Sequence, residues 1–278
     1  MVILELKGVS KSFSRNAGAK SQTGKIEVLR DINLSIRENE FVCIVGRSGS
    51  GKTTLISLIA GLIEPDAGAI LLEGKLIEGP GPDRGVIFQN YSLLPWLSVF
   101  ENVYLAVDAV APNISETEKR QRTEKYINLV NLGTALKKVP RELSGGMRQR
   151  VAVARGLAMD PKVLLLDEPF SALDALTRGT LQEELARIWT ETRKTVVMIT
   201  NDIDEAILLA DTIYTLTRAP AATLGPAIIV DAAHPRTRAQ LSGQANYQKA
   251  RRETLKNLTF RAKDNVVGTT DAAAVILQ

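Results

Sequence analysis

Hydrophobic and polar residues alternate along the N-terminal part of the chain. The alternation at residues 2–13 and 27–36 predicts two strands, with a polar stretch at 14–24 between them. An apolar run at residues 41–45 predicts a third strand. Two short strands are predicted further on, at residues 69–73 and 84–89. We expect the first two strands to form an antiparallel layer beside the main sheet.

A helical period replaces this pattern from residue 91 to about 161. It includes a helix over residues 115–132, for which Asn113 and Ser115 are candidate N-caps and Gly133 a candidate stop. We expect a helical subdomain inserted in an α/β domain.

Strands return after residue 161, at 162–167 and 195–200, and an amphipathic helix over 175–192 separates them. A strand, a helix and a strand in this order indicate a parallel sheet with right-handed crossovers. Two further strands at 211–216 and 227–230 precede a polar, helical tail. The predicted fold class is therefore α/β, with a parallel-sheet core.

The composition permits a large core and predicts a soluble, cytoplasmic chain. Hydrophobic residues make up 45% of the 278 residues. No apolar run approaches the roughly 18 to 20 residues that span a bilayer, and the N-terminus lacks the features of a signal peptide. The single cysteine, Cys43, cannot form an internal disulfide, and we expect it to be a small buried hydrophobic residue.

The net charge of +4 does not by itself indicate a nucleic-acid partner, because both signs are interspersed along most of the chain. The C-terminal part is the exception. Between positions 236 and 264 its basic residues are Arg236, Arg238, Lys249, Arg251, Arg252, Lys256, Arg261 and Lys263, against Glu253 and Asp264. A solvated helix face explains them, and attraction to an anionic partner or to lipid head groups is the alternative.

A glycine-rich run follows the apolar strand at 41–45. Its residues are Gly46, Arg47, Ser48, Gly49, Ser50, Gly51, Lys52 and Thr53. The glycines let backbone N–H groups turn inward around an anion, Lys52 can reach terminal phosphates, and the Thr53 hydroxyl can ligate Mg²⁺. A helix predicted from Thr54 to residue 60 directs its positive end at the phosphates. A plain Gly/Ser-rich turn is the alternative, but the strand before and the helix after favour nucleotide binding.

Two carboxylates end the apolar strand at 162–167. Asp167 can hold a metal ion beside the terminal phosphate, directly or through water, and Glu168 can orient or deprotonate the attacking water. Such a pair also occurs in ordinary turns, but the phosphate loop upstream favours the catalytic role.

A second anion site is predicted at residues 143–150. Ser144, Gly145 and Gly146 expose backbone donors at the start of a helix. One nucleotide does not need two such sites in one chain. We therefore expect this site to serve a nucleotide held by another subunit, in a head-to-tail pair.

In this combination of motifs, the chain resembles the ATPase subunit of ATP-binding cassette transporters over about residues 2–230. The matching motifs are the phosphate loop, Gln89, the signature at 143–149 and the loop at 171–174, which ends in Asp174. The resemblance implies ATP and Mg²⁺ as cofactors, with Thr53, Gln89 and Asp167 at the metal. It also implies that Phe13 stacks on adenine, although a buried core phenylalanine is the alternative.

The resemblance further implies a nucleotide-binding domain at residues 1–230, with the helical subdomain at about 91–161 inserted, and a basic tail at 231–278. One residue departs from the family pattern. Asn201 occupies the position of the switch histidine that contacts the γ-phosphate. Asparagine donates a hydrogen bond but carries no proton or positive charge near neutral pH. We therefore hypothesise slow hydrolysis at this chain's own site, and a heterodimer with a histidine-bearing ATPase.

Two stretches, 79–89 and 93–96, are similar to importers of nitrate, sulfonates and taurine. Residues 200–206 and 220–226 are most similar to the nitrate and bicarbonate branch. This resemblance implies membrane permease subunits and a second ATPase fused to a solute-binding-like domain as partners. It places the chain at the cytoplasmic face of the membrane as a peripheral subunit, with nitrate as the expected ion and bicarbonate, then sulfonate or taurine, as alternatives.

A surface for the membrane subunits is expected near Gln89 and residues 91–102. Leu93, Leu94, Trp96 and Leu97 either receive a short helix of a permease or pack inside the helical subdomain. A DNA-repair ATPase with the same signature would need a long heptad-bearing insertion, and none is present. Asn201 also leaves an alternative function possible, in which the chain is a regulatory module that uses bound ATP only as a structural clamp.

Overall fold

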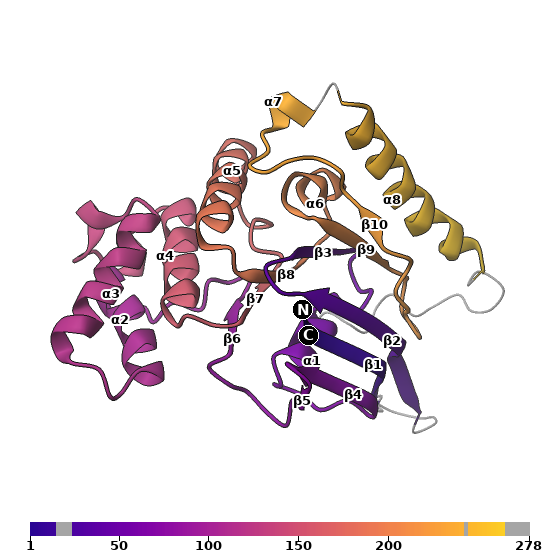
Figure 1. Ribbon diagram of the computed structural model, residues 1–278, viewed down its shortest axis with the longest axis horizontal. Coiled ribbons are helices and arrows are strands. Elements are labelled where there is room, and N and C mark those ends of the chain that lie inside the picture. The colour runs from indigo at the N-terminus through magenta and orange to yellow at the C-terminus, as the bar shows by residue number, and fades with distance from the viewer. Residues whose placement is uncertain (15–23, 242–243, 265–278) are drawn as a thin grey trace, which may run out of the picture. The chain divides into compact units, whose positions relative to one another are not determined.

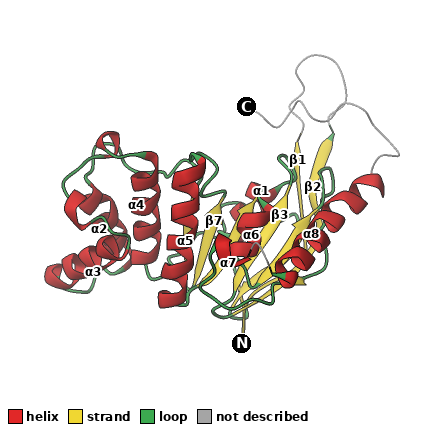
Figure 2. Ribbon diagram, turned by 90° about the horizontal axis from the view of Figure 1, so that it is seen from above, coloured by secondary structure: helices red, strands yellow, loops and turns green. Residues whose placement is uncertain are grey.

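The computed structural model describes residues 1–14, 24–241 and 244–264, with side chains described as far as residue 258. The chain forms two compact units. Unit 1 comprises Met1–Pro80, Met198–Ala232 and Arg238–Gln278, and unit 2 comprises Gly81–Val197 and Ala233–Thr237. Figures 1 and 2 label their elements.

Unit 1 contains the antiparallel sheet that the sequence predicts. Its strands are β1 (Val2–Ser14), β2 (Lys25–Arg37), β4 (Ala67–Leu72) and β5 (Lys75–Leu76), in the order β2-β1-β4-β5. In β2 the side chains of Ile32, Leu34 and Ile36 are buried while their neighbours are exposed, which is the period-two pattern of a strand with one covered face. The predicted antiparallel layer is confirmed.

Unit 1 also contains a parallel pair. All six residues of β3 (Phe41–Gly46) are buried, and β3 pairs in parallel with β9 (Thr212–Leu216), to which β10 (Ile228–Ile229) adds antiparallel. Helices α1 (Lys52–Ile59), α6 (Ile203–Leu209), α7 (Arg238–Leu241) and α8 (Ala245–Asp264) belong to the same unit. Cys43 is fully buried in β3, as expected.

Unit 2 pairs β6 (Arg84–Ile87) in parallel with β7 (Val163–Asp167) and packs α4 (Gly145–Ala158) on β6. Helices α2 (Val99–Val110) and α3 (Glu116–Leu129) contact each other and α4, which gives the predicted helical cluster. The unit also holds two 3-10 turns, Gly133–Ala135 and Pro140–Glu142, and helix α5 (Ala175–Thr192). Strand β8 (Thr195–Thr200) carries the chain from unit 2 to unit 1.

The limits of α3 correct one prediction. Ser115 is the N-cap, in a reciprocal capping box with Glu118, and Asn113 is not. The helix ends at Leu129, so the predicted stop at Gly133 is wrong. Asn131 supplies the left-handed conformation, at φ 57°, that a glycine was expected to supply.

Two limits near the predicted site also differ. Helix α1 begins at Lys52, two residues before the predicted start, because Gly51 at φ 92° is its N-cap. Strand β6 ends at Ile87, where its pairing with β7 stops, so Gln89 lies in a turn. Helices α7 and α8 lie within the predicted tail, whose boundary at residue 230 stays a prediction.

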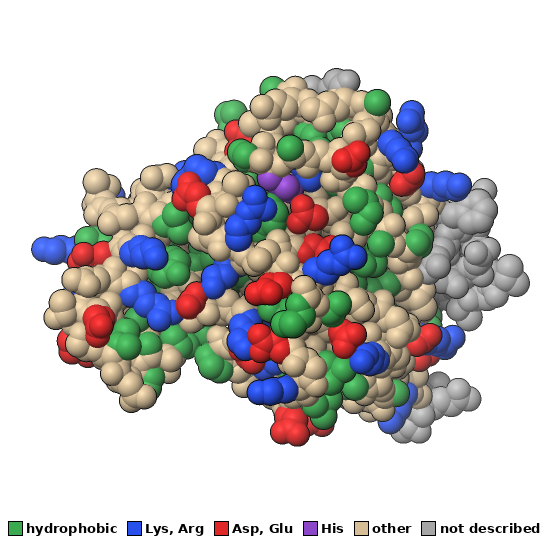
Figure 3. Space-filling view, viewed as in Figure 1, with side chains coloured by type: hydrophobic (Ala, Val, Ile, Leu, Met, Phe, Trp, Pro, Cys, Tyr) green, Lys and Arg blue, Asp and Glu red, His purple; other side chains and the backbone are tan. Residues whose placement is uncertain are grey.

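Among the residues that the structure describes, no helix combines the length and apolarity needed to cross a membrane. Most of the polar stretch predicted at 14–24 lies outside the described residues, as do residues 265–278 of the predicted tail and the side chains of Arg261 and Lys263. On the face seen in Figure 3, basic and acidic side chains are interspersed.

Candidate functional site

The glycine-rich loop of unit 1 connects the end of β3 to the start of α1. Gly49 and Gly51 adopt φ values of 74° and 92°, which favour glycine. A Cβ on Gly46 would lie 2.6 Å from Ser50 Oγ, and one on Gly51 would lie 2.8 Å from Val28 Cγ1. A larger residue at either position would clash with these side chains, so the glycines permit the tight turn that an anion cradle requires.

The side chains of the loop fit a polyphosphate. Lys52 is buried, and its Nζ donates to the carbonyl oxygens of Gly46 (3.0 Å) and Arg47 (3.1 Å), so the ammonium group is held inside the loop. The Ser50 hydroxyl is buried and has no hydrogen-bond partner within the described residues. Thr53 is exposed in the first turn of α1, where the N-terminal N–H groups of the helix favour negative charge. These donors suit the phosphates of a nucleotide.

Phe13 lies near the end of β1, and 42% of its surface is exposed. The alternative of a buried core phenylalanine is therefore wrong. Lys11 Nζ lies 5.7 Å from the ring centroid. An exposed ring of this kind is suited to stacking on a base, and that role stays a prediction.

Asn201 follows β8 directly and is exposed. The next residue, Asp202, is the N-cap of α6, and its Oδ1 accepts hydrogen bonds from the N–H groups of Asp204 (2.9 Å) and Glu205 (3.1 Å). Within the described residues the Asn201 amide makes no hydrogen bond. It is thus available to donate one to a ligand.

In unit 2 the buried strand β7 ends at Asp167, which is itself 6% exposed, and Glu168 follows. Glu168 has a φ of 43°, so the chain turns sharply there. Its carbonyl oxygen accepts hydrogen bonds from Ser171 Oγ (2.9 Å) and Ser171 N (3.2 Å). This turn sets the direction of the carboxylate that is predicted to orient water.

Ser171 also binds Gln89. The Gln89 amide donates from Nε2 to Ser171 Oγ at 3.0 Å, which leaves Oε1 as the atom suited to a cation. The hydroxyl thus connects Gln89 to the main chain of Glu168. Sequence reasoning placed Ser171 in a motif but missed this contact, because the two residues are 82 positions apart.

The signature motif and Asp174 come together within unit 2. Ser144 is the N-cap of α4, and its Oγ accepts a hydrogen bond from Met147 N (3.3 Å). A Cβ on Gly146 would lie 2.7 Å from Thr177 Cγ2, so the start of α4 approaches the start of α5 closely. Asp174 caps α5 by accepting from Thr177 N (3.0 Å), and its hydrogen bonds with Thr177 lower the pKa of its carboxyl.

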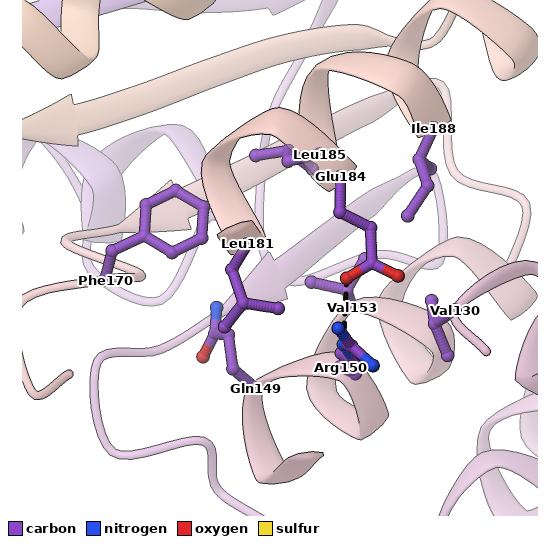
Figure 4. Close-up of a pocket in the computed structure, with 9 residues that line it drawn as sticks. All are labelled: Val130, Gln149, Arg150, Val153, Phe170, Leu181, Glu184, Leu185 and Ile188. Atoms are coloured by element: carbon purple, nitrogen blue, oxygen red, sulfur yellow. Dashed lines mark ion pairs between the residues drawn. The ribbon is translucent and has the colours of Figure 1, made fainter. Parts of the chain in front are cut away.

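Residues of α4 and α5 also line a small, partly open pocket in unit 2 (Figure 4). Its apolar wall consists of Val130, Val153, Phe170, Leu181, Leu185 and Ile188. Arg150 and Glu184 point toward one another across it, with Nε and Oε2 2.8 Å apart. These two atoms lack the alignment of a hydrogen bond, so their attraction is Coulombic. With a volume of about 10 Å³, the pocket is too small for a nucleotide.

The predicted site residues are divided between the units. Unit 1 holds the phosphate loop with Thr54, Phe13 and Asn201, and unit 2 holds Gln89, Asp167, Glu168, the signature residues and Asp174. The predicted metal ligands Thr53, Gln89 and Asp167 belong to both, so a common magnesium site stays a prediction.

Comparison with known proteins identifies the family. The model of a family described as "ABC transporter" matches residues 29–171. The chain belongs to the ABC transporter family. Membership in this ABC family implies ATP hydrolysis coupled to transport.

Three curated relatives show how far the similarity extends. The nitrate import ATP-binding protein NrtD of Synechococcus elongatus is 49% identical over 238 residues, which cover 86% of this chain and 87% of the relative. NrtC of the same organism is 52% identical over 235 residues, but the match spans only 36% of that relative. The bicarbonate transport ATP-binding protein CmpD, also of Synechococcus elongatus, is 48% identical over 238 residues, 86% of each chain.

Solved structures confirm the α/β fold class. The ATP-binding cassette MJ0796 bound to ADP and Pi matches with a TM-score of 0.70 and 30% identity, and covers 83% of this chain and 100% of its own. The structure of cbiO1 from Clostridium perfringens matches with a TM-score of 0.67 and 27% identity, over 81% of this chain and 88% of its own.

Proposed function

We propose that the chain is the ATP-binding and ATP-hydrolysing subunit of a membrane ABC importer for a small inorganic anion, with nitrate as the substrate. The observation that carries this proposal is the match to NrtD, which extends over 87% of that relative. CmpD is nearly as similar, so bicarbonate is the alternative ion. Import of sulfonate or taurine is a third possibility, which is supported only by the resemblance of residues 79–89 and 93–96 to such importers.

The residues have distinct roles in this proposal. The phosphate loop, with Lys52, binds the phosphates of ATP, and Phe13 contacts adenine. Thr53, Gln89 and Asp167 would ligate Mg²⁺, which neutralises charge on the phosphates when bound. Glu168 orients the attacking water, and the turn stabilised by Ser171 fixes its main chain. Ser144, Gly145, Gly146 and Asp174 act on the nucleotide of a second ATPase.

The proposed partners are permease subunits and a second, histidine-bearing ATPase fused to a solute-binding-like domain. NrtC and NrtD are two nitrate import ATP-binding proteins of the same organism, and both match this chain, which supports a pair of unlike ATPases. Together with the permease, this assembly places the chain at the cytoplasmic face of the membrane as a peripheral subunit.

Trp96 is the proposed contact with a permease. It is 72% exposed, whereas Leu93, Leu94 and Leu97 are partly buried, so the predicted apolar cluster reduces to one fully exposed residue. A buried residue, Asn102, fixes the loop around it.

The Asn102 side chain accepts from Leu94 N (2.8 Å) and donates to the carbonyl oxygens of Leu97 (2.9 Å) and Ser98 (3.0 Å). A rigid loop that presents an exposed tryptophan is suited to receive a partner helix, because little side-chain and loop entropy is lost on binding.

The alternative role is a hydrolysis-impaired subunit that binds ATP as a clamp. Asn201 supports it, since an exposed amide donates a hydrogen bond but cannot carry the charge of a histidine. Replacement Glu168→Gln separates the two roles. It stops turnover at this chain's own site if that site hydrolyses ATP, and leaves the turnover of the complex unchanged if the site is a clamp.

The substrate is tested with the chain assembled with its permease subunits and second ATPase in lipid vesicles. We expect ATP-dependent accumulation of ¹⁵N-nitrate, with excess bicarbonate or taurine failing to compete. Accumulation of ¹³C-bicarbonate without nitrate uptake would transfer the assignment to the alternative ion. Uptake of neither ion would contradict the import of a small inorganic anion.

A further inference from the structure

Helix α8, near the C-terminus, packs within unit 1 against α6, β9 and β10 (Figure 1). Four of its residues, Tyr247, Ala250, Arg251 and Thr254, recur at the spacing of one helix face. Ala250 and Thr254 are buried at 3% and 0% exposure. This face is therefore the one that α8 turns toward the rest of unit 1.

Two side chains of this face bind the same atom of α6. Tyr247 Oη donates to Asp204 Oδ1 at 2.8 Å, and Arg251 Nε donates to the same oxygen at 2.9 Å. The Asp204 carboxylate raises the pKa of the Arg251 guanidinium, while burial and then the hydrogen bond to Asp204 raise the pKa of the Tyr247 phenol. One basic residue of the tail thus makes a specific contact, although its side chain stays 44% exposed.

Asp204 lies in the first turn of α6, three residues after Asn201. The same turn is capped by Asp202, which binds the N–H groups of Asp204 and Glu205. Helix α6 also contacts β3, the strand that leads into the phosphate loop. The start of α6 therefore connects α8 to the segment that carries Asn201.

We propose that Tyr247 and Arg251 are positioning residues for ATP hydrolysis: by holding Asp204, they fix the start of α6 and so the position of Asn201. This inference rests on the proposed function and on the prediction that the Asn201 amide donates a hydrogen bond to the γ-phosphate of ATP. It assigns the C-terminal helix a role in turnover, although α8 supplies none of the predicted nucleotide ligands.

The test uses the full chain in its complex. The variants are Arg251→Gln, Tyr247→Phe and the two combined, with Arg252→Gln as the matched control. Arg252 lies on the same helix, is exposed and makes no ion pair with the described residues, so its replacement removes the same charge without touching Asp204.

We expect the double variant to lower kcat for ATP about two- to fivefold, the range that exposed ion pairs allow, with KM unchanged. Hydrogen exchange of the amides at residues 203–205 should accelerate in the same variant. Arg252→Gln should change neither quantity. In an Asp204→Ala background, Arg251→Gln should not lower kcat further, because this double-mutant cycle measures only the interaction between Asp204 and Arg251.

A kcat of the double variant equal to that of Arg252→Gln overturns the proposal, as does a change confined to KM. An undiminished effect of Arg251→Gln in the Asp204→Ala background also overturns it. The proposed function fails separately, if Lys52→Ala leaves ATP turnover and uptake of the complex at wild-type levels.

Discussion

The ion pair that joins α4 to α5 gives a prediction with a defined magnitude. Replacement Glu184→Gln keeps the size of the side chain and the oxygen that accepts a hydrogen bond from Asn131 Nδ2 (3.1 Å), and it removes the charge that faces Arg150. It therefore isolates the Coulombic part of the contact. The affected helices carry the signature and Asp174 at their starts.

The loss of stability in Glu184→Gln depends on how deeply the ion pair is buried. Breaking a fully buried pair costs about 3–5 kcal/mol, and an exposed pair contributes about 0.2–1 kcal/mol. The side chain of Glu184 is 9% exposed and that of Arg150 is 26% exposed, so this pair lies between the two cases. We expect a loss of about 2 kcal/mol in the free energy of unfolding, which corresponds to a fall in Tm of about 4–8 °C.

Tryptophan fluorescence during urea denaturation measures this loss in unit 2. The chain has two tryptophans, Trp96 and Trp189, both in that unit, and Trp189 is a buried residue of α5. The matched control is Glu191→Gln, which breaks an exposed i,i+4 pair with Arg187 on the same helix and should cost about 0.3–0.5 kcal/mol. Equal losses in the two variants would refute the argument from burial.

Three further changes test the nucleotide site and its surroundings. Asn201→His should raise ATP turnover of the complex about tenfold or more, because it restores a donor that can carry charge; an unchanged rate removes the idea that Asn201 limits hydrolysis. Phe13→Ala should weaken ATP binding about fivefold, as expected for one lost stacking contact, and calorimetric titration showing wild-type affinity would exclude a contact with adenine. Trp96→Ala should reduce co-purification with the permease and transport together while leaving ATP binding intact, and wild-type assembly and transport would end its docking role.

Local sequence patterns predicted helices and strands well where a capping residue or the end of an apolar run defines the limit of the element. Helix α5 and strand β8 have the predicted limits, because Asp174 caps the helix and the strand consists of an apolar run at residues 196–199 between two threonines. The phosphate loop was equally clear from its glycines. The start of α1 was missed because Gly51 takes a left-handed conformation that sequence periodicity does not reveal.

Contacts between distant residues could not be predicted in this way. The hydrogen bond of Gln89 to Ser171 joins residues 82 positions apart, and the contacts of Asp204 with Tyr247 and Arg251 span 43 and 47 positions. No local propensity encodes these distances, because they depend on how helices and turns pack. From the sequence, the tail could be described only by its excess of basic residues. The contact of Arg251 with α6 became visible in the structure.

The most direct test of the central claim is ATP-dependent nitrate uptake by vesicles that contain the complete complex with Lys52→Ala in this chain. Lys52 holds its ammonium group inside the phosphate loop, so its loss should remove ATP binding at this site. Lys75→Ala, an exposed lysine of β5, is the matched control. The account predicts that Lys52→Ala abolishes nitrate uptake while Lys75→Ala preserves it. Undiminished uptake in the Lys52→Ala complex would contradict the claim that this chain drives import.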